Sequence, residues 1–456
     1  MTPELIISVS GLRGIVGESL TPKVASRYVR AFLAETPPGP IVVTLDGRTH
    51  GPMLAQVLSS TIADCGRECI YGGVAATPTT GVLVRDQQAA GGIQISASHN
   101  PAEYNGIKLF AASGRVIPGA AGQKVLDRYR AAASNEPTVA TQRAAFVDTN
   151  ADDIDVNGVE SHEKLVLAIC NADRIRARHF RVVLDANHGA GGILGNLLLK
   201  NLGCDVKNIG GGPDGLFVHP PEPTEANLYD TIEFTKQSGA DVTFCQDPDA
   251  DRLAIIDERG RYIGEEKTPA LCIEHVLSTG RLGAVVTNCS TSRMSEDIAR
   301  KYGVPFFRSK VGEANVVDLM LEKDAAIGGE GNGGVIDPRV GLVRDSFVGM
   351  ALVLDAMAAR GLPVSKLADE LPQYAIHKTT IAVAADEIPS ALDTLERHFG
   401  DATADRLDGL RLDWPSGAWL LVRPSNTEPI VRAIAEAPTI EEAKAICEQA
   451  AQAITQ

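Results

Sequence analysis

The sequence predicts an α/β protein with three similar α/β domains, whose sheets are mixed and mostly parallel, and a smaller C-terminal α+β domain. Short β-branched runs alternate with amphipathic stretches rich in Ala and Leu. One strand–turn–helix pattern occurs three times, and this pattern changes after about residue 371. The length of 456 residues suits three or four domains of about 150 residues each.

The first repeat lies in the N-terminal part of the chain. An apolar run at 41–43 precedes a polar turn at 46–48, a helical stretch at 52–64 and a second strand at 68–71. A third strand then ends in the polar sequence 96–101. This order of elements is typical of a βαβ unit.

The second and third repeats have the same order. The second consists of 182–184, 185–189, a helical stretch to about 202, 205–209 and 242–252. The third consists of 285–286, 288–292, a helical stretch to about 302, 305–307 and 325–334. Ligand loops lie beyond the carboxyl ends of strands in open α/β sheets, so we expect the three terminal loops to point into one cleft. Chance similarity between β-turn-α patterns is the alternative interpretation.

Domain boundaries follow from the repeats. The expected domains are 1–150, 151–255, 256–370 and 371–456, the last with strands near 380–384 and 417–422 and a helix from Ile440.

Composition and charge exclude several classes of protein. The formal net charge of −15 does not suit binding to a nucleic-acid backbone. No apolar run approaches the roughly 18 residues of a membrane span, and the N-terminal segment has no signal-peptide pattern. The eight cysteines form no CxxC pair, which fits reduced thiols. These features predict a cytoplasmic protein with neither a nucleic acid nor a membrane as partner.

The loop 247–252 carries the strongest electrostatic signal. Asp247, Asp249 and Asp251 alternate directly after a strand, and their charges converge only where a cation offsets the repulsion. Mg²⁺ fits such oxygen ligands when a phosphate supplies another ligand. The Gly and distal Glu of a calcium EF-hand are missing. An acidic surface turn is the alternative interpretation.

A serine beside a histidine follows the third strand of the first repeat. Ser98 and His99 suggest a hydrolase, but GxSxG is absent and adjacent residues rarely face each other productively. A serine that carries a phosphoryl group needs a metal, cations and N–H donors instead. An ordinary turn is the alternative, and the nearby acidic loop favours the phosphoryl interpretation.

Two further loops suit a phosphorylated sugar. The segment 423–429, with Arg432 behind it, offers two arginines, two hydroxyls and an amide to a phosphate, although its composition also suits a helix cap. The segment 329–334 matches GxGxxG, but Pro338 soon follows where a dinucleotide fingerprint needs a helix, so we reject that match. Its carboxylate and amide suit sugar hydroxyls. No P-loop is present, so a nucleotide is not expected.

The chain resembles the α-D-phosphohexomutases, the family of phosphoglucomutase, phosphomannomutase and phosphoglucosamine mutase, over essentially its whole length. Five ordered motifs carry the resemblance: SGLRG at 10–14, SASHNP at 96–101, DPDADR at 247–252, GEGNGG at 329–334 and RPSNTEP at 423–429. It implies four domains around a central cleft, which carry in order the phosphoserine, metal, sugar and phosphate loops.

The resemblance also implies roles for individual residues. Ser98 is the implied phosphoserine, next to His99, and with Asp247, Asp249 and Asp251 it holds Mg²⁺. The implied cations around the transferring phosphoryl group are Arg13, Lys108, Arg252 and Lys310, with Lys108 a candidate general acid/base. The implied substrate contacts are Glu330, Asn332, Arg423, Ser425, Asn426, Thr427 and Arg432.

The implied activity is that of an isomerase acting on small sugar phosphates, as a monomer or homodimer. It interconverts hexose 1- and 6-phosphates through a hexose 1,6-bisphosphate, which also serves as activator. Asn332 stands where the family usually has Ser, and Gly334 where several members have His. The Asn resembles archaeal-type phosphoglucosamine mutases, which favours glucosamine phosphate over glucose or mannose phosphate. A phosphatase or kinase-like phosphotransferase and a non-catalytic sugar-phosphate-binding protein are the rival hypotheses.

Overall fold

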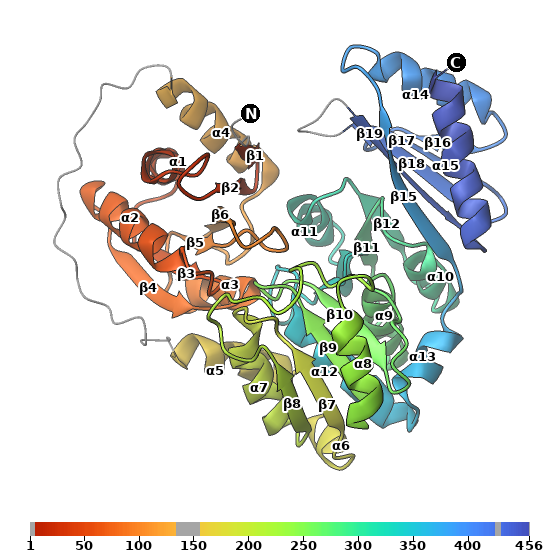
Figure 1. Ribbon diagram of the computed structural model, residues 1–456, viewed down its shortest axis with the longest axis horizontal. Helices are drawn as coiled ribbons and strands as arrows, with labels where there is room; N and C mark the ends of the chain where they lie inside the picture. Colours follow the sequence, from red (N-terminus) through yellow and green to blue (C-terminus); the bar gives the residue numbers. More distant parts are fainter. Residues whose placement is uncertain (1–4, 134–155, 425–429, 456) are drawn as a thin grey trace.

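The computed structural model describes residues 5–133, 156–424 and 430–455. It has four units, each built on one sheet, which follow one another around the molecule from the red N-terminal unit to the blue C-terminal one (Figure 1). Within the described residues no single helix is long and apolar enough to cross a membrane. One helix pair, Ser346–Arg360 with Val364–Glu370, reaches that length and hydropathy only when joined, and it is bent by 91°.

The first unit has a six-stranded mixed sheet in the order β1-β2-β6-β5-β3-β4. Its strands are β1 (Ile6–Ser8), β2 (Gly11–Ile15), β3 (Ile41–Leu45), β4 (Cys69–Val74), β5 (Gly91–Ile95) and β6 (Tyr104–Ala111). Its helices are α1 (Pro22–Glu35), α2 (Gly51–Asp64), α3 (Thr77–Asp86) and α4 (Gly119–Ala133). β3 and β5 are buried along their whole length, because they are interior strands of the sheet.

The second and third units have four-stranded sheets in the orders β10-β9-β7-β8 and β12-β11-β13-β14. The second unit contains β7 (Arg181–Asp185), β8 (Asp205–Ile209), β9 (Val242–Gln246), β10 (Leu253–Asp257), α5 (Val156–Leu167), α6 (Ala172–Arg176), α7 (Gly191–Asn201) and α8 (Tyr229–Ser238). The third contains β11 (Val285–Asn288), β12 (Phe306–Ser309), β13 (Ile327–Glu330), β14 (Gly334–Ile336), α9 (Lys267–Ser278), α10 (Met294–Lys301), α11 (Glu313–Glu322), α12 (Ser346–Arg360) and α13 (Val364–Glu370).

The three α/β units share one strand topology. A central strand (β3, β7 or β11) pairs in parallel with the next two strands of its unit, and a fourth strand adds in antiparallel fashion. The repeat predicted from the sequence is therefore confirmed. β14, a strand and not a helix, follows the glycine-rich loop after β13, in agreement with rejection of the dinucleotide fingerprint.

The fourth unit is a five-stranded antiparallel sheet in the order β15-β19-β18-β17-β16. It contains β15 (Ala375–Ala382), β16 (Thr403–Asp405), β17 (Leu410–Asp413), β18 (Trp419–Pro424), β19 (Ile430–Ala437), α14 (Ile388–His398) and α15 (Ile440–Thr455). It has its own hydrophobic core, whereas the second and third units share one continuous core around α12. A small apolar cluster around Cys289, Trp419 and Leu421 joins the fourth unit to the third.

Candidate active site

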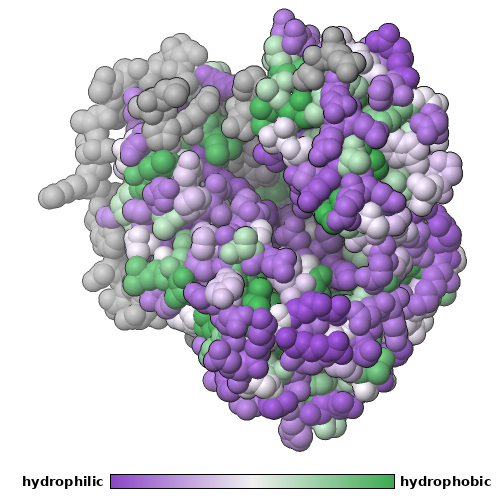
Figure 2. Space-filling model, turned by 45° about the vertical axis from the view of Figure 1, so that its right-hand side comes forward, coloured by the Kyte–Doolittle hydropathy of each residue, from purple (hydrophilic) through white to green (hydrophobic). Residues whose placement is uncertain are grey.

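A cleft of about 720 Å³ is lined by residues of all four units. Figure 2 shows a hollowed face whose surface is mainly hydrophilic. Among the described residues, seven cationic and three acidic side chains line the cleft. The cations are Arg13, Lys108, Arg252, Arg344, Lys378, Arg423 and Arg432. A positively charged cleft in a protein with a net charge of −15 indicates an anionic ligand.

Ser98 lies in the loop between β5 and β6, where the first unit meets the second. Its hydroxyl donates to Asp247 Oδ2 at 2.7 Å, and only 1% of the residue is exposed. Its φ of +51° is in the left-handed region, which is uncommon for a residue other than glycine. The Ser96 hydroxyl accepts from the Ser98 backbone N–H at 2.8 Å and helps to hold this conformation. The loop thus fixes one hydroxyl against a carboxylate of the next unit.

Asp247, Asp249 and Asp251 come together in the loop between β9 and β10. One carboxylate oxygen of each lies within 4.8 Å of the others, and all three residues are buried. Asp249 Oδ1 and Asp251 Oδ1 have no hydrogen-bond partner within the described part of the chain. Buried, unpartnered carboxylate oxygens are the donors that a hard divalent cation takes, so these residues fit a metal ion.

The charges around this cluster are only partly balanced. Lys108, on β6, contacts Asp249 and also Asp251, the latter at 2.8 Å. Burial would raise the pKa of Asp249, but Lys108 holds it below its usual value. Burial raises the pKa of Asp247 well above its usual value, and the charges of Asp249 and Asp251 raise it further. A bound divalent cation would relieve this repulsion.

His99 and Arg13 lie around the serine. His99 Nδ1 is 3.3 Å from Ser98 Oγ. Burial, assisted by the charges of Arg252 and Arg13, lowers the pKa of His99 to about 2, so its ring is neutral at physiological pH. Arg13 Nη1 donates to Asn100 Oδ1 at 3.1 Å, which ties β2 to the serine loop. Arg252 and Arg13 both line the cleft, where they face an incoming anion.

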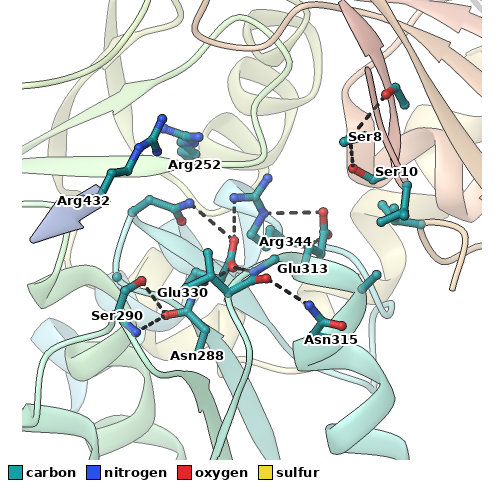
Figure 3. Close-up of a pocket in the computed structure, with 18 of the residues that line it drawn as sticks. Ser8, Ser10, Arg252, Asn288, Ser290, Glu313, Asn315, Glu330, Arg344 and Arg432 are labelled. Carbon is teal, nitrogen blue, oxygen red and sulfur yellow. Dashed lines mark hydrogen bonds and ion pairs between the residues drawn. The ribbon is translucent and has the colours of Figure 1, made fainter. Parts of the chain in front are cut away.

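The end of β13 presents the carboxylate of Glu330 to the cleft (Figure 3), and the loop that follows presents the amide of Asn332. Glu330 Oε1 accepts from Asn288 Nδ2 at 2.7 Å, and Glu330 Oε2 accepts from Arg344 Nη1 at 2.9 Å. Asn332 Nδ2 donates to Glu330 Oε2 at 3.4 Å. The Glu330 carboxylate is thereby held in one orientation at the wall of the cleft.

The remaining predicted residues fall in different places. Arg423 and Arg432 are directly opposite each other on β18 and β19, and both line the cleft. Ser425, Asn426 and Thr427 lie outside the described residues. Lys310 is exposed after β12; its neighbours Val311 and Gly312 line the cleft, but Lys310 is not among the lining residues. Its predicted role in catalysis stays a prediction.

Family models for the four domains of phosphoglucomutase/phosphomannomutase match this chain in order. Domain I matches residues 5–136, domain II residues 160–260, domain III residues 265–374 and the C-terminal domain residues 381–453. The chain belongs to the phosphoglucomutase/phosphomannomutase family.

Individual relatives agree with this family. A phosphoglucomutase/phosphomannomutase of Thermococcus kodakarensis is 36% identical over 95% of each chain. A protein of Methanopyrus kandleri named "Probable phosphoglucosamine mutase" is 30% identical over 95% of this chain and 94% of its own. A solved family protein from Burkholderia thailandensis, 25% identical, superposes with a TM-score of 0.81 over 99% of this chain and 98% of its own.

Within this family fold, Arg48 is a residue that the sequence interpretation missed. Its side chain is buried, and its Nη1 and Nη2 donate to the backbone carbonyls of Ser98, Asn100, Pro101 and Tyr104 at 2.6 to 3.0 Å. Its Nε donates to Asp46, so all five N–H groups of the guanidinium are used. Phe217 of the second unit lies over the guanidinium at 4.9 Å. The position of the Asp-Gly-Arg turn after β3 was the only sequence signal for this role.

We expect Arg48→Lys to lower kcat by about 100-fold. A lysine retains the charge but loses at least two charge-assisted hydrogen bonds to the serine loop. The loop then leaves its strained conformation, and the activation free energy rises by about 3 kcal/mol. Steady-state kinetics measure the effect. Arg67→Lys is the matched control, because Arg67 also donates to backbone carbonyls, at Gly39 and Pro37, remote from the cleft. Equal losses in the two variants would contradict a specific role for Arg48.

Two other residues hold the acidic loop from neighbouring units. Thr77, at the start of α3, donates its hydroxyl to Asp249 Oδ2 at 2.5 Å. Arg344, just before α12, donates to Asp251 Oδ2 at 2.6 Å and also binds Glu330. Neither residue stands in a motif that carries chemistry by itself, so only their tertiary contacts identify them.

Proposed function

We propose that this chain is a phosphohexomutase, an isomerase that interconverts hexose 1-phosphates and hexose 6-phosphates. One observation carries the proposal: the Ser98 hydroxyl lies 2.7 Å from Asp247, within a cluster of three buried aspartates, beside a cationic cleft that all four units line. A serine so placed suits phosphoryl transfer, which depends on positioning and on electrostatic stabilisation of phosphate oxygens. Family membership supports the same assignment.

In this proposal Ser98 carries the phosphoryl group that is exchanged with the sugar. The P–O bond to Ser98 Oγ breaks, a P–O bond to the free sugar hydroxyl forms, and the proton of that hydroxyl passes to Ser98 Oγ. Lys108 is the proposed general acid/base. Burial would lower the pKa of Lys108, but Asp249 and Asp251 raise it, so the amine enters the reaction protonated.

Asp247, Asp249 and Asp251, with a phosphoserine oxygen, are the proposed ligands of Mg²⁺. When bound, the ion would neutralise charge on the transferring phosphoryl oxygens. Arg13 and Arg252, which line the cleft nearby, would contact the same group, and Lys310 remains a candidate for it.

The second phosphate of the sugar is assigned to the fourth unit. Arg423 and Arg432 face the cleft from adjacent strands, and Ser425, Asn426 and Thr427 are proposed to complete this site. Glu330 and Asn332 are proposed to contact sugar hydroxyls. The hexose 1,6-bisphosphate intermediate must turn end for end before it returns its other phosphate to Ser98. The separate core of the fourth unit suits this step, because that unit can move without disturbing the shared core of the second and third.

Glucosamine phosphate is the proposed sugar. Asn332 in the sugar loop resembles the archaeal-type phosphoglucosamine mutases, and the Methanopyrus relative carries that name. Glucose and mannose phosphates form the second candidate, because the relative with 36% identity is named phosphoglucomutase/phosphomannomutase.

Phosphorus NMR tests both parts of the proposal. The protein is incubated with Mg²⁺, a trace of hexose 1,6-bisphosphate and, in turn, the 6-phosphates of glucosamine, glucose and mannose. We expect a 1-phosphate signal, formed fastest from glucosamine 6-phosphate. Faster conversion of glucose or mannose phosphate would replace the proposed sugar. Release of inorganic phosphate alone would indicate a phosphatase, and no conversion of a tightly bound sugar would indicate a binding protein.

A further inference from the structure

A buried histidine joins the first three units behind the acidic loop. His162 lies on α5 of the second unit and has no exposed surface. Its Nδ1 is 2.9 Å from the hydroxyl of Thr79, on α3 of the first unit. Its Nε2 is 2.7 Å from Asp345 Oδ2, at the N-cap of α12 in the third unit. A ring that donates from Nε2 to Asp345 and accepts the Thr79 hydroxyl at Nδ1 satisfies both nitrogens.

The α3 end of this bridge holds one side of the acidic loop. Thr77 is the first residue of α3, and its hydroxyl donates to Asp249 Oδ2 at 2.5 Å. Its backbone N–H donates to the Asp249 carbonyl at 2.9 Å. Thr79, which His162 contacts, is two residues further along the same rigid helix. A displacement of α3 relative to α5 therefore moves the carboxylate of Asp249.

The α12 end of the bridge holds the other side of the loop. Asp345 Oδ1 accepts from two backbone N–H groups in the first turn of α12, so Asp345 fixes where the helix begins. The next residue, Ser346, donates its hydroxyl to the Ala250 carbonyl at 2.7 Å. The preceding residue, Arg344, donates to Asp251 Oδ2 at 2.6 Å. Both neighbours of Asp345 thus bind the loop that carries the three aspartates.

We propose that His162 is a positioning residue that sets the spacing of the three loop carboxylates by fixing α3 and α12 against α5. The helices α3 and α5 pack directly together, as do α5 and α12. His162 suits this role because its two ring nitrogens reach opposite neighbours at a fixed separation. The affinity of the loop for a divalent cation and the rate of phosphoryl transfer both depend on the resulting geometry.

A second histidine–aspartate pair supplies the matched control. His275 Nε2 lies 3.0 Å from Asp355 Oδ2, and both residues are buried. This pair joins α9 to α12, and neither residue contacts the acidic loop in the described part of the chain. Loss of either pair removes a buried hydrogen bond to a carboxylate, and both losses are expected to lower stability. The loss is expected to be larger for His162, which also binds Thr79, whereas Asp355 keeps its contact with Arg174 when His275 is replaced. Only the His162 pair is expected to affect metal binding.

The experiment measures Mn²⁺ affinity by electron paramagnetic resonance on the full-length protein without substrate. We expect His162→Phe to weaken Mn²⁺ binding about 10-fold, a loss typical of residues that orient metal ligands without binding the metal. We expect His275→Phe to leave Mn²⁺ affinity within two-fold of the wild type. His162→Gln, whose amide can still donate to Asp345, is expected to recover part of the loss. Thr79→Val removes only the hydrogen bond between Thr79 and His162. We expect it to weaken Mn²⁺ binding by a smaller factor, and it serves as the test variant should His162→Phe not fold.

A kinetic measurement complements the metal titration. At saturating Mg²⁺ we expect His162→Phe to lower kcat about 10-fold with KM within two-fold, because the substrate contacts are intact. This second part rests on the proposed mutase function, whereas Mn²⁺ binding does not. Mn²⁺ affinity unchanged in both His162→Phe and Thr79→Val, or lowered equally by His275→Phe, would overturn the inference. Absence of mutase activity in the wild type would count against the proposed function only.

Discussion

Ser98→Ala is expected to lower mutase turnover by at least about 1,000-fold, or about 4 kcal/mol in activation free energy, and to leave the fold intact. The variant has no oxygen at this position to accept the phosphoryl group, and among the described residues no other hydroxyl is hydrogen-bonded to Asp247. Alanine adopts the left-handed φ at Ser98 about as readily as serine, so the loop need not change. Steady-state kinetics and intact-protein mass spectrometry before and after addition of hexose 1,6-bisphosphate measure turnover and phosphorylation.

Ser365→Ala is the matched control for this variant. Ser365 is also buried, and its hydroxyl donates to a carboxylate oxygen of Glu258 at 2.5 Å, far from the cleft. We expect it to lower thermal stability and leave turnover within about two-fold. Mutase activity retained by Ser98→Ala in a preparation free of phosphorylated wild-type enzyme would contradict the assignment of Ser98.

Asp247→Asn is expected to weaken metal binding and turnover by at least about 100-fold, about 2.7 kcal/mol, without loss of stability in metal-free buffer. Lys108 contacts Asp249 and Asp251, but Asp247 has no ion pair with any residue that the structure describes. Neutralising Asp247 therefore removes a ligand charge and also removes repulsion within the buried cluster. The melting temperature in the presence of chelator should equal or exceed that of the wild type.

Asp257→Asn is the control for Asp247→Asn, because it shows what the loss of a buried aspartate charge away from the cleft does to stability and to metal binding. Asp257 is equally buried at the far end of β10 and pairs with Arg261 at 2.8 Å. We expect this variant to melt at a lower temperature and to bind Mn²⁺ with unchanged affinity, the reverse of Asp247→Asn. If Asp247→Asn bound Mn²⁺ as tightly as the wild type, the metal site would have to lie elsewhere.

The strand-end loops could be predicted because their chemistry is local in sequence. Asp247, Asp249 and Asp251 stand within five residues directly after a buried strand, and the repeated topology places the other polar loops at the same edge of their own sheets. Arg48 and His162 could not be predicted in the same way. Each acts through partners that are distant in the chain, and an isolated Arg or His in the sequence is equally compatible with an ordinary surface or core position.

The sequence by itself determined the α/β repeat, the order of the four units and the residue types offered by each loop, because strand burial, helix periodicity and turn chemistry are local properties. The strand-end positions also predicted that the loops share one cleft, but the tertiary structure alone decided which of their side chains touch. It decided that Ser98 meets Asp247 across a unit boundary, that Lys310 stays exposed beside the cleft, and that Arg344 links Asp251 to Glu330. These contacts depend on how whole units pack, and that packing is set by the shared core around α12 and by buried polar bridges such as Thr79–His162–Asp345.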